Sequence, residues 1–550
     1  MPFSNMYPIL FVFFLIHMSY AQCPPGQGNN PNTSACEACI AGFNFSDVDD
    51  LTACKALSND VWTQLGADID GEDGGDESGW SVSLSADGSR VAIGAYLNDG
   101  NGDDAGHVRV YSWDGSAWTQ LGVDIDGEAA GDSSGSVSLS ADGSTLAIGA
   151  YLNDGNGDNA GHVRVYSWDG SAWTQLGADI DGDVAGDRSG QVSLNTDGNT
   201  VAIGSIANNN GTGHVRVYER DSAGEWVQVG MDIDGEATDD NSGFSISLSA
   251  DGNTLAIGAL GNDGNGNKAG HVRVYSWDGS SWTQLGADID GEAAGDESGF
   301  SVSLSADGST VAIGALLNIG SGNAPGHARV YSWGGISWTQ LGADIDGEAF
   351  GDFSGVSVSL SADASTVAIG AIGNGFNAGH VRVYSWGGSS WVQTGADIDG
   401  EAAGDYSGYP VSLSADGSKV AIGASANGGN GVMAGHVRVL YLDPLCSPGE
   451  EVVPPTPSSD RQCAAITCTA NPCAVGETCT NYDGGYTCHV GPLYAANDTF
   501  CEDNDVNTLN TPKSTCDEWK NVYNSLTCCG GNLACQVFER KYKCGGCCAK

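Results

Sequence analysis

The sequence has little positive charge, no helical periodicity and, over most of its length, no cysteine. Its 20 Lys and Arg residues face 69 Asp and Glu residues, so the 550-residue chain carries a formal net charge of −49. This imbalance argues against nucleic acid and anionic membranes as partners, because both are polyanions and would repel the chain. Glycine is abundant, with 83 residues, but it does not recur at every third position, which excludes collagen.

Long hydrophobic runs are also missing. The apolar run at residues 9–16 is too short to span a bilayer, and no later stretch is long enough to do so. Ser19-Tyr20-Ala21 follows it and has the small-x-small pattern of a signal-peptidase site. The sequence therefore predicts a signal peptide at 1–21 and a secreted, extracellular protein with no membrane span.

The cysteines are confined to the two ends of the chain. Four of the 18 lie before residue 55, none lies between 55 and 445, and fourteen follow. Even-numbered clusters in a secreted chain indicate disulfide-stapled modules, which we expect at 22–58, 445–490 and 491–550. The sequence also contains candidate N-glycosylation sites at Asn32, Asn44, Asn210 and Asn497.

Between the cysteine clusters one unit is repeated seven times. Gly-His-Val-Arg-Val, with Ala328 replacing the first Val once, recurs at spacings of 52 to 57 residues, and Asp-Ile-Asp-Gly also recurs seven times. Each unit contains four short strand-like runs, such as 81–85, 91–95, 107–111 and 118–121, separated by turn residues. Units of this length with four strands predict an all-β fold, a seven-bladed β-propeller over residues 59–444.

The two ends of the repeat region predict how the ring closes. The first recognisable strand, at 61–65, resembles the fourth strand of a unit, and the last, beginning at Val437, resembles the third. Seven strands of each kind exist only if 61–65 supplies the outer strand of the final blade. We therefore expect the two ends to pair, which removes the exposed edges of an open array.

These motifs resemble a known family. Ser-Gly-x-Ser-Val-Ser-Leu-Ser, Val-Ala-Ile-Gly-Ala and Gly-His-Val-Arg-Val-Tyr are similar to the FG-GAP repeat of integrin α-subunit propellers. The resemblance covers roughly 60–442 and implies a seven-bladed ring used for extracellular recognition. Ser78 and its equivalents replace the Phe of the family's Phe-Gly, and the Ala-Asp-Gly-Ser turn is too short for the family's calcium loop. Integrin-type calcium sites are therefore not carried over.

Long acidic loops are expected on one face of the ring, because alternating strands bring the blade-to-blade links and the second-to-third strand loops to the same end. Three of these loops have the alternating oxygen spacing of a weak calcium site, with Asp99, Asn101 and Asp103, then Asp154, Asn156 and Asp158, then Asp263, Asn265 and Asn267. The alternative is an Asx/Gly turn. Calcium is the only cofactor that the sequence suggests. For Asp-Ile-Asp-Gly we favour turn hydrogen bonds and pairing with Arg109 and its equivalents over calcium.

Other residues of the repeat divide into structural and ligand-contacting candidates. The seven repeat histidines lie on separate blades, too far apart to share one zinc ion, so a structural role is favoured. The variable position of Gly-Asp-x-Ser-Gly suits ligand contact, at Glu77, Arg188, Phe353 and Tyr406.

Aromatics before the first strands, such as Trp80, suit packing between blades, with sugar stacking as the alternative. A nucleophilic serine is disfavoured because no separate base accompanies it, so no catalytic residue is predicted.

The flanks resemble small extracellular modules. Cys23, Cys36, Cys39 and Cys54, and then Cys446 and Cys463, are similar to cysteine-rich modules of tumour-necrosis-factor-receptor and ephrin-receptor type. Cys468-x4-Cys473-x5-Cys479-x8-Cys488 resembles the first part of an EGF-like module, with Val490 where the fifth cysteine is expected. That resemblance implies bridges Cys468–Cys479 and Cys473–Cys488.

Together these features predict a secreted, non-enzymatic binding or adhesion protein that recognises an extracellular protein or glycan through the acidic face of the propeller. A carbohydrate-active propeller enzyme and a calcium-binding structural or wall protein are the alternatives. Oligomeric state and ligand identity do not follow from the sequence.

Overall fold

The structure of the chain is a computed structural model that describes residues 61–318 and 325–443. Outside these ranges it gives only short paired strands: β1 (Gln27–Asn30) with β2 (Ala35–Ala38), β3 (Phe43–Asn44) with β4 (Lys55–Ala56), β40 (Glu450–Val453) with β41 (Gln462–Ala465), β42 (Glu477–Tyr482) with β43 (Gly485–Val490), and β44 (Phe500–Cys501) with β45 (Thr511–Pro512). The predicted signal peptide, disulfides and glycosylation sites Asn32, Asn44 and Asn497 lie outside the described residues. The chain divides into two units, 1–445 with 454–461, and 446–453 with 462–550.

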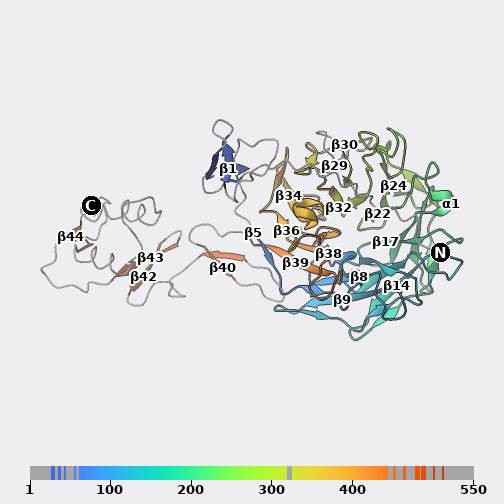
Figure 1. Cartoon of the computed structure of the whole chain (residues 1–550), viewed down its shortest axis with the longest axis horizontal. Coiled ribbons are helices and arrows are strands. Elements are labelled where there is room, and N and C mark those ends of the chain that lie inside the picture. Colours follow the sequence, from blue (N-terminus) through green and yellow to red (C-terminus); the bar gives the residue numbers. More distant parts are fainter. Residues whose placement is uncertain are drawn as a thin grey trace. The chain divides into compact units, whose positions relative to one another are not determined.

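The described residues form seven antiparallel sheets, which follow one another around a ring in sequence order (Figure 1). We call the sheets blades 1 to 7. The innermost strands are β7 (Ser81–Leu84), β12 (Ser134–Leu139), β17 (Ser189–Leu194), β22 (Ser245–Leu248), β27 (Ser301–Leu304), β32 (Ser354–Leu360) and β37 (Val411–Leu413). The second strands are β8 (Arg90–Ala95), β13 (Thr145–Ala150), β18 (Thr200–Ser205), β23 (Thr254–Ala259), β28 (Thr310–Ala315), β33 (Thr366–Ala371) and β38 (Lys419–Ala424). The predicted all-β, seven-bladed propeller is confirmed.

The third strands begin at the repeat histidine: β9 (His107–Trp113), β14 (His162–Trp168), β19 (His214–Arg220), β24 (His271–Trp277), β29 (His327–Trp333), β34 (His380–Trp386) and β39 (His436–Asp443). The fourth strands are β10 (Trp118–Gln120), β15 (Trp173–Gln175), β20 (Trp226–Gln228), β25 (Trp282–Gln284), β30 (Trp338–Gln340), β35 (Trp391–Gln393) and β5 (Val61–Gln64).

Each blade also has a fifth strand of two residues, which the sequence analysis did not predict. These strands are the Ile-Asp of the Asp-Ile-Asp-Gly motifs: β6 (Ile69–Asp70), β11 (Ile125–Asp126), β16 (Ile180–Asp181), β21 (Ile233–Asp234), β26 (Ile289–Asp290), β31 (Ile345–Asp346) and β36 (Ile398–Asp399). Each pairs with the beginning of the third strand, so that Asp126 lies opposite His107 and Ile125 opposite Val108. The motif is therefore part of the outer edge of its blade, on the same side of the third strand as the fourth strand, rather than only a turn.

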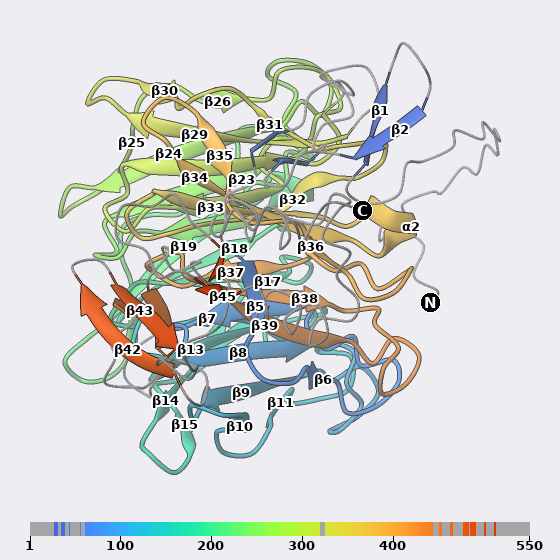
Figure 2. The ribbon, with the colours of Figure 1, turned by 90° about the vertical axis from the view of Figure 1, so that its left-hand side faces the viewer.

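The ring closes as predicted. Val61–Gln64 of β5 pairs antiparallel with Leu440–Asp443 of β39, and β6 continues along the same strand, with Asp70 opposite His436 (Figure 2). The innermost strand of blade 7 also contacts that of blade 1. Blade 7 therefore takes its outer strands from the beginning of the repeat region.

The hydrophobic core consists of layers between neighbouring blades. In one layer, Val108 and Val110 of blade 1 pack against Val137, Leu146 and Ile148 of blade 2. The core is therefore continuous around the ring, and no blade has a core of its own. The approach is close enough that a Cβ atom at Gly94 would lie 1.9 Å from the carbonyl oxygen of Gly135 in the next blade, which explains the glycine of Val-Ala-Ile-Gly-Ala.

Two sets of hydrogen bonds join the innermost strands across blade boundaries. Serine hydroxyls of one strand accept from the backbone of the next, for example Ser83 from Leu139 N at 3.0 Å, and Ser412 from Leu84 N across the closure. At the first turn of each blade, one backbone N–H donates to the carbonyl of the next blade. These seven bonds form a closed circle through Ala86, Ala141, Thr196, Ala250, Ala306, Ala362 and Ala415.

Helical structure is confined, among the described residues, to two four-residue segments, α1 (Asn208–Gly211) and α2 (Asn374–Asn377). Their central residues have positive φ, 51° and 61° at Asn209 and Asn210, so they are left-handed turns in the second-to-third strand loops of blades 3 and 6. No described helix is long and apolar enough to cross a membrane.

Candidate functional site

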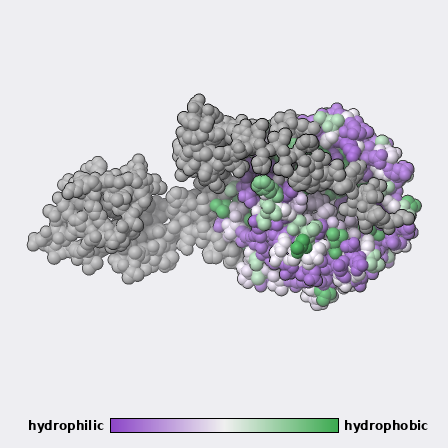
Figure 3. Space-filling view, viewed as in Figure 1, coloured by the Kyte–Doolittle hydropathy of each residue, from purple (hydrophilic) through white to green (hydrophobic). Residues whose placement is uncertain are grey.

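The two ends of the ring differ in the length of their loops. We call the end with the blade-to-blade links and second-to-third strand loops the loop face, and the end with the tight turns, such as 85–89 and 113–117, the hairpin face. The part of the ring surface that is coloured in Figure 3 is largely hydrophilic, with hydrophobic residues scattered across it. The loop face carries both the predicted calcium loops and the predicted ligand contacts.

The predicted calcium loops are tied down by hydrogen bonds. Asp99 Oδ1 accepts from the backbone N–H of Asp104 at 2.8 Å, and Asn101 Nδ2 donates to the carbonyls of Gly127 and Glu128 at 2.7 and 3.2 Å. The same bonds recur at Asp154 and Asn156, and at Asp263 and Asn265. Asp103 and Asp158 are exposed. These contacts are those of an Asx turn that holds the link to the next blade, and calcium binding at these loops stays a prediction.

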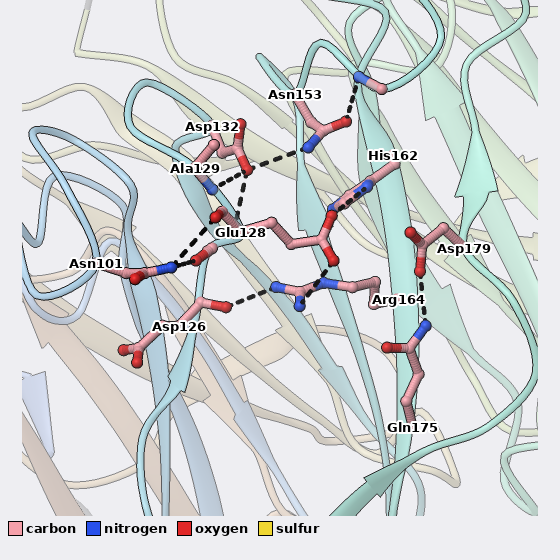
Figure 4. A network of polar contacts seen from close by, with 12 residues as sticks. Asn101, Asp126, Glu128, Ala129, Asp132, Asn153, His162, Arg164, Gln175 and Asp179 are labelled. Atoms are coloured by element: carbon pink, nitrogen blue, oxygen red, sulfur yellow. Dashed lines mark hydrogen bonds and ion pairs between the residues drawn. The ribbon is translucent and has the colours of Figure 1, made fainter.

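The repeat arginines join each blade to the preceding one. Arg164 Nη2 donates to the carbonyl of Asp126 at 2.7 Å, and its Nη1 lies 3.8 Å from Glu128 Oε1 (Figure 4). Arg109 makes the equivalent contacts with Asp70 and Glu72. The predicted pairing of the arginines with the side-chain carboxylates of Asp-Ile-Asp is therefore wrong. The arginine bonds to the main chain of the motif and lies beside the acidic residue that follows its glycine.

The first Asp of each motif is held by a glutamine of the fourth strand. Gln175 Nε2 donates to Asp179 Oδ1 at 2.6 Å, and the same bond occurs in all seven blades. The second carboxylate oxygen of Asp124 lies 3.8 Å from the Nδ1 atom of His107. The glutamine thus orients the aspartate toward the histidine of its own blade.

Each histidine therefore lies between two carboxylates at a blade boundary. In the cluster drawn in Figure 4, His162 Nδ1 is 3.9 Å from Glu128 Oε2 of the preceding link, and Asp179 lies on the other side. His162 is only 1% exposed, and its Nε2 has no hydrogen-bond partner. Burial, reinforced by the charge of Arg164, lowers the pKa of His162, while the carboxylates oppose that shift. The sequence placed these histidines in a structural role but did not identify the carboxylates around them.

The variable residues of Gly-Asp-x-Ser-Gly share one unusual backbone conformation. All seven have φ between 52° and 56°, although none is glycine: Glu77, Ser133, Arg188, Asn241, Glu297, Phe353 and Tyr406. The neighbouring aspartate holds the turn, as Asp132 Oδ2 accepts from Ala129 N at 2.9 Å and Asn153 Nδ2 at 3.1 Å. Such a conformation costs a non-glycine residue about 1 kcal/mol or more and is concentrated at functional sites.

These residues lie at the loop-face ends of the innermost strands, next to the aromatic side chains. Glu77 Oε2 accepts from the hydroxyl of Tyr96 at 3.0 Å, and burial raises the pKa of Glu77. The ring of Tyr96 lies 4.5 Å from that of Trp80. The four candidate contacts Glu77, Arg188, Phe353 and Tyr406 belong to blades 1, 3, 6 and 7 and share this position.

The aromatic side chains before the first strands meet each other. Ring centroids are 5.4 Å apart for Trp80 and Tyr409, 6.4 Å for Tyr409 and Phe300, and 4.9 Å for Phe300 and Phe244. Blades 5 and 7 are not neighbours, so these contacts extend past blade 6 and do not belong to one interblade layer. Packing between adjacent blades was therefore an incomplete prediction. Burial raises the pKa of Tyr409 to about 12.

A separate hollow of about 240 Å³ lies at the rim of blade 3, lined by Tyr218, Glu225, Trp226 and the link 178–181. Its lining includes Asp179, Ile180 and Asp181 of an Asp-Ile-Asp-Gly motif but none of the predicted calcium or ligand-contact residues. Asn210, the sequon within the described residues, is exposed in the α1 turn.

The comparisons with known proteins assign neither a family nor a function. No protein-family model and no curated protein matches the sequence. Among solved structures, the chain is similar to one titled "Kuenenia stuttgartiensis Hydrazine Synthase", with 14% identity, a TM-score of 0.43, and coverage of 66% of this chain and 95% of that one. This similarity is too weak to support an argument about activity. The FG-GAP resemblance therefore rests on the motifs alone.

Proposed function

We propose that the protein is a secreted, non-enzymatic binding or adhesion protein whose loop face recognises an extracellular protein or glycan. The supporting observation is the set of seven Gly-Asp-x-Ser-Gly turns, which share one backbone conformation and differ in the side chain at x. A constant backbone with varied, half-buried or polar side chains is typical of a recognition surface on a rigid scaffold.

The residues next to these turns fit such a ligand. Trp80, Tyr96 and Tyr409 provide apolar ring faces with polar atoms at their edges, a combination suited to sugars and to protein side chains. The surrounding links are acidic, which favours partners with basic groups and disfavours polyanions. The buried serines of the same turns have no hydrogen-bonded base among the described residues, since Ser78 Oγ and its six equivalents lack any partner.

The test uses glycine at the strained positions, because glycine accepts a φ near 55° without cost. Phe353→Gly and Tyr406→Gly should keep or raise the melting temperature and should weaken, by tenfold or more, binding to whatever the wild-type protein captures on a glycan and protein array. Ile336→Ser is the matched control, because Ile336 is 87% exposed on the hairpin face. Equal binding by all three variants would contradict the proposal, and turnover of a polysaccharide on the array would replace it with the enzymatic alternative.

A further inference from the structure

The repeat histidines are buried at the blade boundaries, and five of them face one carboxylate of their own blade and one of the preceding link. In His271, for example, Nδ1 lies 3.8 Å from Asp288 Oδ2 and 4.0 Å from Glu236 Oε2. These separations are too long for hydrogen bonds, so neither carboxylate accepts a proton from the ring. Groups of one histidine and two acidic residues, with ligand atoms within 4.8 Å of one another, include His107, His162, His214, His271 and His436.

In each carboxylate, one oxygen interacts with a neighbouring side chain, and this interaction orients the other oxygen toward the imidazole. Gln284 donates to Asp288 Oδ1, which leaves Oδ2 toward the imidazole, and Arg273 lies 3.9 Å from Glu236 Oε1, which leaves Oε2 toward the imidazole. In blade 2, Glu128 likewise presents Oε1 to Arg164 and Oε2 to His162. Two separate elements therefore position the acidic groups before any ligand is present.

The histidines supply an independent indication that something belongs between these groups. His327 is 1% exposed, and neither of its ring nitrogens has a hydrogen-bond partner, although Nδ1 lies 4.0 Å from Asp344 Oδ2. His380 also lacks a partner at both nitrogens. A buried polar nitrogen without a partner costs about 1–3 kcal/mol. Five of the seven repeat histidines have one, at Nε2 in His162, His214 and His271 and at both nitrogens in His327 and His380.

We propose that the boundaries at His107, His162, His214, His271 and His436 are binding sites for a divalent first-row transition-metal ion, with zinc as the reference ion. Each ion is held by the histidine Nδ1, the first Asp of the same blade and the acidic residue that follows the preceding Asp-Ile-Asp-Gly. An imidazole nitrogen with two carboxylate oxygens is a donor set for Zn²⁺ or Mn²⁺ rather than for Ca²⁺, which takes oxygen ligands alone. Ligand distances of about 2.0–2.2 Å place the ligand atoms about 3.4 Å from one another, so the histidine–carboxylate separations of 3.8 and 4.0 Å at His271 shorten by about half an ångström when an ion binds.

The geometry accommodates a separate ion at each of these five boundaries, and not one shared ion. The nearby arginine lowers the affinity of each site, but it contacts the carboxylate oxygen that faces away from the histidine. Because the ligands come from two blades, a bound ion joins them. Metal binding is therefore expected to stabilise the ring as well as to fill the sites.

The experiment measures Zn²⁺ bound to the purified full-length, oxidised protein after chelation, by equilibrium dialysis and elemental analysis. The wild-type protein should bind several ions through the ring, and its melting temperature should rise with Zn²⁺ and fall with chelator. Asp179→Asn should bind one ion fewer than wild type, and so should Glu128→Gln, whose substitution lies in the same site but on the preceding link. Because the two substitutions lie on different elements of the same site, a folding defect in one variant does not decide the outcome.

Asp169→Asn is the matched control, because this residue belongs to the same blade but lies in a tight turn of the hairpin face, where its Oδ1 accepts from Ser171 N and Ala172 N. It should leave the zinc stoichiometry unchanged. Any zinc on the cysteines of the flanks cancels in the difference between variant and wild type. Equal stoichiometry in wild type, Asp179→Asn and Glu128→Gln would overturn the proposal, and so would a melting temperature that does not respond to zinc or chelator.

Discussion

The two faces of the ring satisfy their buried polar groups in different ways. On the hairpin face, Ser140 Oγ accepts from Thr145 N and donates to Asp142 Oδ1, so the turn is self-sufficient. On the loop face, Ser134 Oγ six residues earlier is equally buried and has no partner, as is true of its equivalents in all seven blades. Unpartnered buried groups are rare in native proteins and concentrate where function competes with stability. The difference indicates that the hairpin face is adapted to the stability of the ring and that the loop face is adapted to function.

The largest expected effect compares two arginines that both bond to a neighbouring blade. Arg164→Met, on the loop face, removes the donor to the carbonyl of Asp126 and the ion pair with Glu128, and should destabilise the fold by about 2–3 kcal/mol. Arg90→Met, on the hairpin face, removes a partly exposed bond to the carbonyl of Gly143 and should cost about 1 kcal/mol. Chemical denaturation measures both. Equal losses of unfolding free energy in the two variants would show that the loop-face arginines stabilise the ring no more than Arg90 does.

A serine pair tests the comparison directly within blade 2. Ser140→Ala leaves Thr145 N without its acceptor and should lower the free energy of unfolding by about 1–3 kcal/mol. Ser134→Ala removes an unpartnered hydroxyl and should be neutral or stabilising by up to about 1 kcal/mol. Thermal unfolding of the two single variants is sufficient. A destabilising Ser134→Ala would mean that this hydroxyl has a partner in solution.

A smaller effect sharpens the comparison within the hairpin face. Asp114 Oδ1 accepts from Ser116 N and Ala117 N at 2.7 and 2.8 Å, whereas blade 5 has Gly334 at this position. A Cβ atom at Gly334 would meet only ordinary contacts, so Gly334→Asp should stabilise the protein by about 0.5–1 kcal/mol. Gly335→Asp is the control and should destabilise, because φ is 85° there. The melting temperatures decide between these outcomes.

The smallest effect is a pH dependence of the same turn in blade 4. The hydroxyl of Ser280, followed by the backbone of Ser281, lowers the pKa of Asp278 to about 2. Since the folded pKa lies below the unfolded one, this aspartate stabilises the fold at neutral pH, and the contribution is lost as the pH falls toward 2. The melting temperatures of wild type and Asp278→Asn should differ slightly at pH 7 and converge near pH 2. A constant difference would contradict the turn hydrogen bonds.

The sequence predicts the ring well because its signals are local. Alternating strands, turn residues and the unequal ends of the repeat determine the blades and the closure between 61–64 and 440–443. The fifth strand was missed because Ile-Asp is only two residues long and is flanked by turn-forming residues. It forms a strand because the fourth strand pairs only with the end of the third strand, which leaves the beginning of the third strand available for pairing with Ile-Asp.

The candidate sites were predicted less completely because they combine residues of adjacent repeats. Glu128 and His162 are 34 positions apart, and their proximity depends on how one blade packs against the next. The left-handed conformation at Arg188 and Phe353 was also missed, since neither residue type favours it. The constant order in which an acidic residue follows Asp-Ile-Asp-Gly and precedes the next Gly-His-Val-Arg-Val was the one signal that pointed to the clusters, although the spacing between them varies.

The circle of backbone bonds through Ala86 and its equivalents has an electrostatic consequence. Each N–H···O=C dipole is tangential to the circle and is followed head-to-tail by the next, so around seven nearly equivalent positions the vectors cancel. An α-helix adds its peptide dipoles along one axis, but these seven bonds run around the ring and add no net dipole in its plane. The circle therefore joins all seven blades without the partial charges that an α-helix carries at its two ends.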